Sequence, residues 1–273
     1  MQAASRESYA VATERLDTYA RGAEPAKLSA TGDDLGSVAA LLRREPRLRR
    51  ALSDPARSGE DRAALLGTLL GERVSADTRE LLGVLVAGRW SAPSELLDAT
   101  ERLGVEALLA SADRAGELGE VEDELFRFGQ VVAADPGLSS VLADANSPLA
   151  RRAELTGSLL SGKANPVTIR LVEMALAGFG GRSFSAGMTR LVELAADRRD
   201  RQVAYVTVAA PLADDEERRL GAKLAELYGR EVTVKQTVDP AVLGGMSVQV
   251  GSDLYDGTIL RQLTDTRNAL AKR

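Results

Sequence analysis

One stretch of this sequence comes close to a motif that binds phosphate. Gly157-Ser-Leu-Leu-Ser-Gly-Lys163-Ala164 departs from the phosphate-binding loop GxxxxGK[ST] at its last position, where Ala164 replaces a metal-binding hydroxyl residue. Such a loop joins a strand to a helix, whereas helical patterns lie on both sides of this stretch. We interpret Gly162 as the end of a helix, with Lys163 near its negative pole. A nucleotide-binding protein that uses Lys163 stays as an alternative.

Three further clusters have the residue types of a binding site. Gly178-Phe-Gly-Gly-Arg182 is rich in glycine but follows a helical pattern, so it is interpreted as a turn rather than a dinucleotide site. The carboxylates of residues 117–124 lack the alternating oxygen ligands of a calcium loop, so no metal site is expected. The basic cluster Arg43–Arg50 is either a solvated helix face or a docking surface for an acidic partner.

Composition excludes most kinds of catalysis. The 273 residues include no His and no Cys, which removes the usual general base, every Ser-His-Asp triad and thiolate chemistry. The net charge of −5 and the aromatic content of 4% disfavour a nucleic-acid partner. No apolar run approaches the ~18 residues of a membrane-spanning helix. We therefore expect a soluble intracellular protein that is not an enzyme and has no cofactor.

Hydrophobic patterning divides the chain into a helical body and a short α/β end. Apolar residues recur at helical spacing up to about residue 200, and Ser147-Pro148 and Asn165-Pro166 are typical of helix N-caps followed by proline. Beyond that point β-branched residues alternate with others, which predicts strands at 202–209, 232–238 and 246–250. Helices are expected at residues 5–20, 32–44, 47–53, 59–71, 76–88, 93–117, 120–134, 137–143, 148–161, 166–178, 185–199, 214–228 and 258–271.

The helical body contains an internal repeat with an offset of 90 residues. Residues 41–54 align with residues 131–144, and residues 62–70 align with residues 152–160 at six identical positions out of nine. Proline and glycine positions share the offset, which favours duplication over chance similarity of Leu- and Ala-rich helices. The sequence predicts a mainly α protein with two tandem small helical bundles, residues 1–110 and 111–200, and a small α/β domain, residues 201–273.

The C-terminal segments resemble a known family. Residues 204–212 read AYVTVAAPL, residues 238–251 read VDPAVLGGMSVQVG and residues 255–263 read YDGTILRQL. Their order and spacing resemble the delta subunit family of the F-type ATP synthase, whose mitochondrial counterpart is the oligomycin-sensitivity-conferral protein. Leu243 and Thr258 are mild departures from the family's Ile and Ser.

The helical body carries the resemblance over essentially the whole chain. Ser8-Tyr9-Ala10-Val11-Ala12 resembles the family's first helix, and Gly88-Arg89 and Gly181-Arg182 resemble its later Arg at a helix turn. The duplicated helical domain is the main departure, and it occurs in some actinobacterial members.

This resemblance implies a structural role in ATP synthesis and hydrogen ion transport. Family members belong to the peripheral stalk, or stator, which holds the catalytic core of the complex against the torque of the rotating central stalk. The implied partners are the N-terminal helices of the alpha subunit and the b-type stalk subunit. The implied location is the cytoplasmic side of the cell membrane, as a peripheral protein that reaches the membrane only through the complex.

The resemblance also implies where the partners bind. In the family the alpha-subunit helix lies in an apolar groove between the first and fifth helices, and the stalk binds the C-terminal domain. Carried over to this chain, the groove residues are Tyr9, Ala10, Thr13, Leu82, Leu85 and Val86.

Several points stay open on the sequence alone. Any one of the groove residues can instead be core, and either helical copy can be the one that binds the catalytic head. Asp239, Gly244, Gly245, Asp256 and Gly257 are interpreted as turn residues rather than contacts. A free cytosolic helical adaptor is the alternative to the stator.

Overall fold

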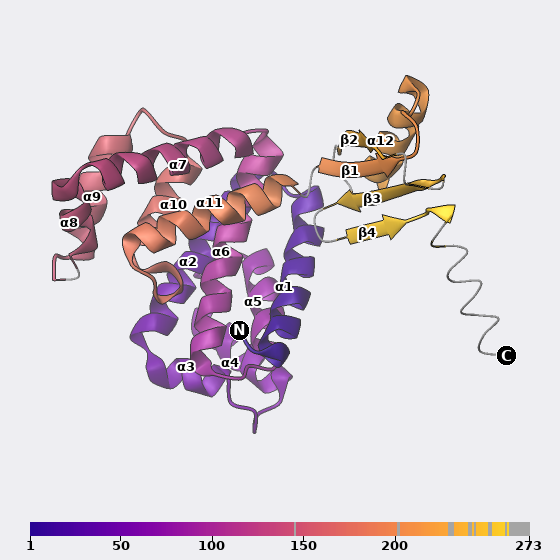
Figure 1. Cartoon of the computed structure of the whole chain (residues 1–273). Helices are drawn as coiled ribbons and strands as arrows, with labels where there is room; N and C mark the ends of the chain where they lie inside the picture. Colours follow the sequence, from indigo (N-terminus) through magenta and orange to yellow (C-terminus); the bar gives the residue numbers. More distant parts are fainter. Residues whose placement is uncertain are drawn as a thin grey trace. The chain divides into compact units, whose positions relative to one another are not determined.

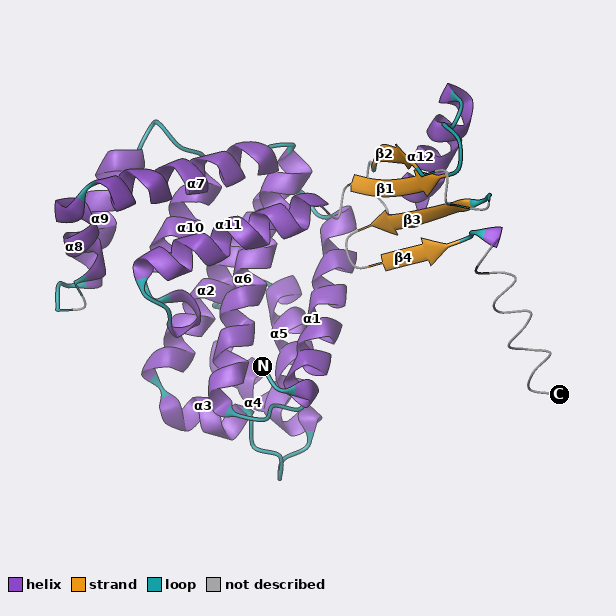
Figure 2. Ribbon diagram, viewed as in Figure 1, coloured by secondary structure: helices purple, strands orange, loops and turns teal. Residues whose placement is uncertain are grey.

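The structure, a computed structural model, consists of two compact units, residues 1–195 and 196–273 (Figure 1). It describes residues 1–144, 146–200, 203–228, 232–239, 242, 244–250, 253–259 and 261. In these parts of the chain the first unit is helical, and the strands all lie in the second unit (Figure 2). The predicted fold, mainly α with a small α/β end, is confirmed.

Five of the six helices in the first half of the helical unit begin at proline or after a capping serine. Pro25, Pro46 and Pro93 occupy the first turns of their helices, and the hydroxyls of Ser58 and Ser75 accept N–H bonds at two others. The helices are α1 (Ala3–Gly22), α2 (Pro25–Arg44), α3 (Pro46–Leu52), α4 (Gly59–Leu70), α5 (Ala76–Ala87) and α6 (Pro93–Ala115).

Helices of the second half follow the same order. Asn165 caps α10 as predicted, but Pro148 keeps an extended ψ of 133°, so α9 begins one residue later than Ser147-Pro148 predicted. The elements are α7 (Leu118–Ala134), α8 (Pro136–Ala143), α9 (Leu149–Leu160), α10 (Pro166–Leu176), the 3₁₀ turn η1 (Phe179–Gly181) and α11 (Phe184–Asp200).

A pair of matching hydrogen-bond networks supports the duplication. The Asp34 carboxylate accepts bonds from the Ser75 N–H (3.0 Å) and the Thr78 hydroxyl (2.9 Å). The Glu124 carboxylate accepts bonds from the Asn165 N–H (2.9 Å) and the Thr168 hydroxyl (2.6 Å). All three members lie 90 residues apart in the two networks. The same pair of bonds thus fixes the start of α5 on α2 and the start of α10 on α7.

Helix α6 belongs to both halves of the helical unit. Leu103 and Ala107 pack in a hydrophobic core with α1 to α5, whereas Leu108 and Leu109 pack in a second core with α7 to α11. Because one continuous helix closes the first bundle and opens the second, the division into bundles at residue 110 stays a proposal.

The described residues of the C-terminal unit form a small sheet that packs against a helix. Its strands lie in the order β2-β1-β3-β4, with β1 parallel to β2 and antiparallel to β3. Ala204, Val206 and Val248 are buried in a core that includes Leu224 of α12, while Tyr205 is 45% exposed. The bounds are β1 (Val203–Val208), α12 (Asp214–Tyr228), β2 (Thr233–Val238), β3 (Met246–Val250) and β4 (Asp253–Asp256).

The sequence did not predict β4. The chain just after β4 explains why two glycines precede β3. Gly244 and Gly245 have φ of 84° and 78°, and a Cβ on Gly245 would lie 2.4 Å from the Gly257 carbonyl oxygen. The Asp256 carboxylate accepts bonds from the N–H and hydroxyl of Thr258. These residues define turns, as interpreted from the sequence. Most of the last predicted helix, 258–271, lies outside the described residues.

Candidate partner-binding site

Helices α1 and α5 lie side by side and antiparallel. The Ser8 hydroxyl accepts a bond from the Arg89 N–H (2.8 Å) and donates one to the Arg89 carbonyl (2.9 Å), just beyond the end of α5. Two turns further along α1, Arg15 pairs with Glu80 at 2.5 Å. These contacts join the two helices at both ends of a shared surface.

Between these contacts the surface is apolar. Val11 shares a face of α1 with Ser8 and Arg15, and 52% of its surface is exposed. On α5, Val84 is half-buried and Ala87 is exposed. We call the strip formed by Val11 and Val84 the α1–α5 seam, because Ala87 lies on the α4 side of α5, against Gly59.

The structure places the residues predicted for this groove in two different environments. Leu82, Leu85 and Val86 are at most 1% exposed, and Tyr9 is also buried, so all four belong to the core of the first bundle. Ala10 is exposed and Thr13 is half-buried, both on the side of α1 away from Ser8 and Arg15, and the Thr13 hydroxyl donates to the Tyr9 carbonyl.

The predicted residues of α5 all lie on its inward face, whereas the α1 set of Tyr9, Ala10 and Thr13 mixes inward and outward positions and misses Val11. The inward residues of α1 are Tyr9, Ala12 and Leu16. Val11 lies outside that stripe, and an apolar residue on the outer face of an amphipathic helix was the signal available in the sequence.

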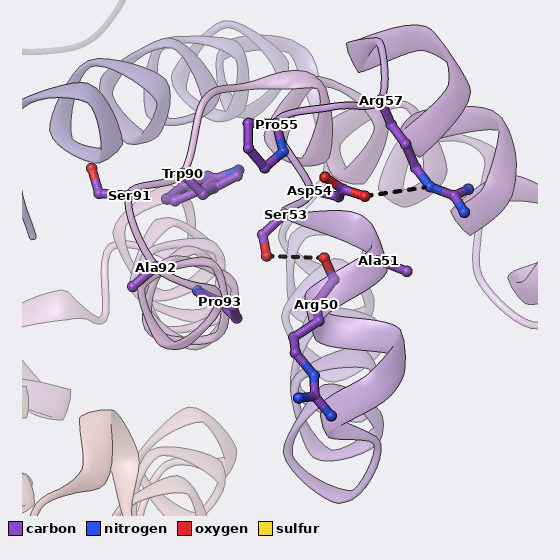
Figure 3. A pocket seen from close by; sticks show the side chains of 10 residues that line it. All are labelled: Arg50, Ala51, Ser53, Asp54, Pro55, Arg57, Trp90, Ser91, Ala92 and Pro93. Atoms are coloured by element: carbon purple, nitrogen blue, oxygen red, sulfur yellow. Dashed lines mark hydrogen bonds and ion pairs between the residues drawn. The ribbon is translucent and has the colours of Figure 1, made fainter.

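A second recess lies beside Trp90, where the loops around α3 and α6 meet (Figure 3). Its volume is about 430 Å³. The Trp90 indole N–H donates to the Leu85 carbonyl at 3.0 Å, and Arg57 lies 3.9 Å from Asp54. The one carboxylate of its lining therefore faces an arginine, and the tryptophan fixes the end of α5.

The local structure explains the two stretches whose sequences resemble a phosphate-binding loop and a cluster of metal ligands. Lys163 lies in the turn after α9, where its N–H donates to the Leu160 carbonyl and Gly162 has a φ of 69°. Helices flank this turn on both sides, so the strand that a phosphate loop requires is missing here. Glu117 and Glu124 bind Asn165 at the start of α10. Within the described ranges no group of three His, Cys, Asp or Glu side chains could hold a metal ion.

Some arginines of the basic cluster bind groups within the protein, and others are exposed to solvent. Arg43 pairs with Glu101, and Arg49 donates to the Leu42 carbonyl. Arg44, Arg47 and Arg50 are exposed.

Hydrogen bonds at the start of α1 hold one carboxylate in its charged form. The Glu95 carboxylate of α6 accepts bonds from the Ser5 hydroxyl and from the Gln2 N–H (2.8 Å). The Ser5 bond in particular lowers the pKa of Glu95 below its ordinary value. This contact fixes the first turn of α1 on α6 next to the α1–α5 seam.

The fold and the seam define a class of protein, a helical subunit with an apolar surface between two helices and a small α/β domain. The family model described as ATP synthase delta (OSCP) subunit matches residues 8–103 and 105–270. The chain belongs to this family.

Full-length relatives carry the same description. ATP synthase subunit delta of Salinispora arenicola is 72% identical over 274 residues, with both chains fully covered. The proteins of that name from Streptomyces griseus and Acidothermus cellulolyticus are 47% and 44% identical, each with 99% of this chain and all of the relative covered. None of the described helices is long and apolar enough to cross a membrane.

Proposed function

We propose that this chain is the stator subunit that links the catalytic head of the ATP synthase to the membrane-anchored b-type stalk. It would bind an N-terminal helix of the alpha subunit through the first helical bundle and the stalk subunit through the C-terminal unit. The chain would have no catalytic role and would lie on the cytoplasmic side of the cell membrane, held there by its partners.

The observation that carries the proposal is the α1–α5 seam. Val11 exposes apolar surface between two pairs of polar contacts, and an amphipathic helix is the partner that such a strip between helices fits. We therefore assign the head-binding surface to Val11 and Val84, whereas Ala10 and Thr13 lie on the side of α1 that faces away from α5. Tyr9, Leu82, Leu85 and Val86 support this surface from the core beneath it.

The C-terminal unit offers a surface for the stalk. Tyr205, Gln249 and Leu254 are paired across β1, β3 and β4, so their side chains share one face of the sheet. Tyr205 and Leu254 are 45% and 63% exposed, whereas the residues that alternate with them pack toward α12. This face, exposed among the residues that the structure describes, is the one we assign to the b-type subunit.

The mechanism of a stator is to transmit a force without moving. Rotation of the central stalk inside the head exerts a torque on it, and the head would turn with the stalk unless it were held. Apolar burial at the α1–α5 seam gives the attachment, while the shared α6 joins the two bundles without a flexible linker. Proton flow then produces rotation relative to a fixed head, which is the condition for ATP synthesis.

A pull-down from membranes tests this proposal. The tagged chain, added to membranes from which the native subunit has been stripped, is expected to recover the alpha subunit and the b-type subunit. Recovery of neither subunit would favour a free cytosolic adaptor. Saturable ATP binding that is lost in Lys163→Ala would favour the nucleotide-binding alternative.

A further inference from the structure

The second bundle contains a counterpart of the α1–α5 seam, between α6 and α10. Helix α10 corresponds to α5, because Thr168 and Thr78 occupy matching networks 90 residues apart. Helix α6 contacts the turn after α10 as α1 contacts the turn after α5. The Glu101 carboxylate accepts a bond from the Gly180 N–H (2.7 Å), as the Ser8 hydroxyl does from the Arg89 N–H (2.8 Å).

Helix α2 of the first bundle covers this second seam. On the α6 side, Gly32 approaches so closely that a Cβ there would lie 2.6 Å from the Leu108 side chain and 3.2 Å from the Gly104 carbonyl. On the α10 side, Arg170 pairs with Asp33 at 2.9 Å and donates to the Ser29 hydroxyl at 2.9 Å.

Arg43 holds the carboxyl-terminal end of α2 against the second seam. Its guanidinium binds the Glu101 carboxylate of α6 and the carbonyl oxygens of Ala177 and Gly178 at the end of α10. The Glu101 side chain is 4% exposed. Removal of α2 would leave a buried carboxylate without its counter-ion, which is strongly unfavourable. The cover is therefore an integral part of the fold.

The direction of α2 is fixed by the same contacts. Along α6, Pro25 of α2 binds Ser111, Gly32 approaches Gly104 and Leu108, and Arg43 binds Glu101, so α2 runs antiparallel to α6. The molecule thus contains one seam with a helix on it and one seam whose valine is exposed.

We propose that this chain has a single receptor for a partner helix, the α1–α5 seam, because α2 seals its duplicate from within. We further infer that the partner helix runs antiparallel to α1, as α2 runs along α6. This inference rests on the proposed function, since it takes the partner to be the alpha-subunit N-terminal segment. The second bundle then serves as a support and not as a second attachment point.

Titration calorimetry with the alpha-subunit N-terminal segment as a synthetic peptide tests the single receptor. The full chain is expected to bind one peptide, and Val11→Glu should weaken binding by about tenfold or more because a carboxylate would be desolvated on the seam. Val131→Glu is the matched control, because Val131 of α7 has a similar exposure of 57%. Circular-dichroism melts verify that both variants fold.

The other outcomes separate the two proposals. Two peptides per chain, undiminished binding by Val11→Glu or loss of binding in Val131→Glu would overturn the single receptor and leave the stator function standing. No binding by the wild-type chain would overturn the proposed function, and this inference with it.

The direction of the partner helix is tested with spin labels. The chain has no native Cys, so Glu7→Cys and Thr18→Cys each accept one label, on exposed positions about three turns apart on α1. The label at residue 18 is expected to broaden NMR signals from the amino-terminal part of the bound peptide, and the label at residue 7 those from its carboxyl-terminal part. The reverse pattern would overturn the inferred direction.

Discussion

At the residue scale, exposure separates the α1–α5 seam, which we propose binds the partner, from core residues on the same helix. Val11 and Ala12 are neighbours in the sequence, yet one is half exposed and the other is fully buried. A helix rotates its side chains by about 100° per residue, so neighbours face different surroundings.

A pair of substitutions makes this difference measurable. Leu85→Asp puts a charge at a site with no exposed surface, so it should destabilise the helical unit by about 3 kcal/mol or more. Val11→Asp keeps its charge in water, and we expect a change within about 0.5 kcal/mol together with loss of head binding. Chemical denaturation and co-sedimentation with the catalytic head measure the two effects. A folded Leu85→Asp variant that fails to bind the head would place Leu85 on the surface instead.

Glu95 gives the start of α1 a dependence on pH. Its folded pKa is lowered, chiefly by the Ser5 hydroxyl, from an ordinary value of 4.5. A carboxylate of this kind stabilises the fold fully above its unfolded pKa, and the contribution is lost as pH falls through the folded pKa. Glu95→Gln should therefore cost about 1 kcal/mol at neutral pH and less near ~pH 3, where the unfolded carboxyl is protonated. Urea denaturation of both chains at the two pH values measures this, and an equal cost at both would refute the charge effect.

At the element scale, close contact between α2 and α6 depends on glycine. Gly32 faces Leu108 and Gly104 with no room for a Cβ, whereas nothing lies within 4 Å of the Cβ position of Gly36, one turn later on the same helix. The two glycines thus serve different purposes, although the sequence presents them alike.

The two glycines make a matched experiment. Gly32→Ala should destabilise the helical unit by about 1–3 kcal/mol, because the helices must separate to admit the methyl group. Gly36→Ala should stabilise it by up to about 1 kcal/mol, because alanine favours the helix and meets no neighbour. Thermal melts give both values. Equal effects of the two substitutions would mean that α2 and α6 are not in close contact at Gly32.

Sequence patterns predicted the elements well where apolar spacing or a cap defines them. The prediction for α5, 76–88, agrees with the observed Ala76–Ala87, and α12 agrees at both ends. Helix α2 begins at Pro25 instead of residue 32, because its first turns contain Ser29, Thr31 and Gly32, which are weak helix formers that tertiary packing tolerates. Strand β4 has four residues, too few to show an alternating pattern, and its pairing with β3 defines it.

The candidate site was predictable only in part. Spacing within one helix identifies which side chains are apolar, but the cover over them comes from other helices. Leu85 and Val11 are both apolar residues on predicted helices, and only the packed structure separates them. The same limit applies to Glu101, whose burial under Arg43 depends on residues that are 58 positions apart.

At the scale of the whole molecule, our proposals imply that duplication added a support rather than a second copy of the binding surface. The matching networks at Thr78 and Thr168 preserve the bundle, while α2 covers the second seam and leaves the first one open. The shared α6 has 23 residues, a length of about 35 Å at 1.5 Å per residue. A continuous helix of this length couples the two bundles rigidly, which suits a protein that resists torque.

The most direct test of the central claim is ATP-driven proton pumping by inverted membrane vesicles that have been stripped of this subunit and then supplied with the purified chain. The wild-type chain and Val131→Glu are expected to restore pumping. Val11→Glu should leave the vesicles uncoupled, with ATP hydrolysis by the head continuing and little acidification inside, because the head is no longer held through the α1–α5 seam. Restoration of pumping by Val11→Glu to the wild-type level would contradict the account.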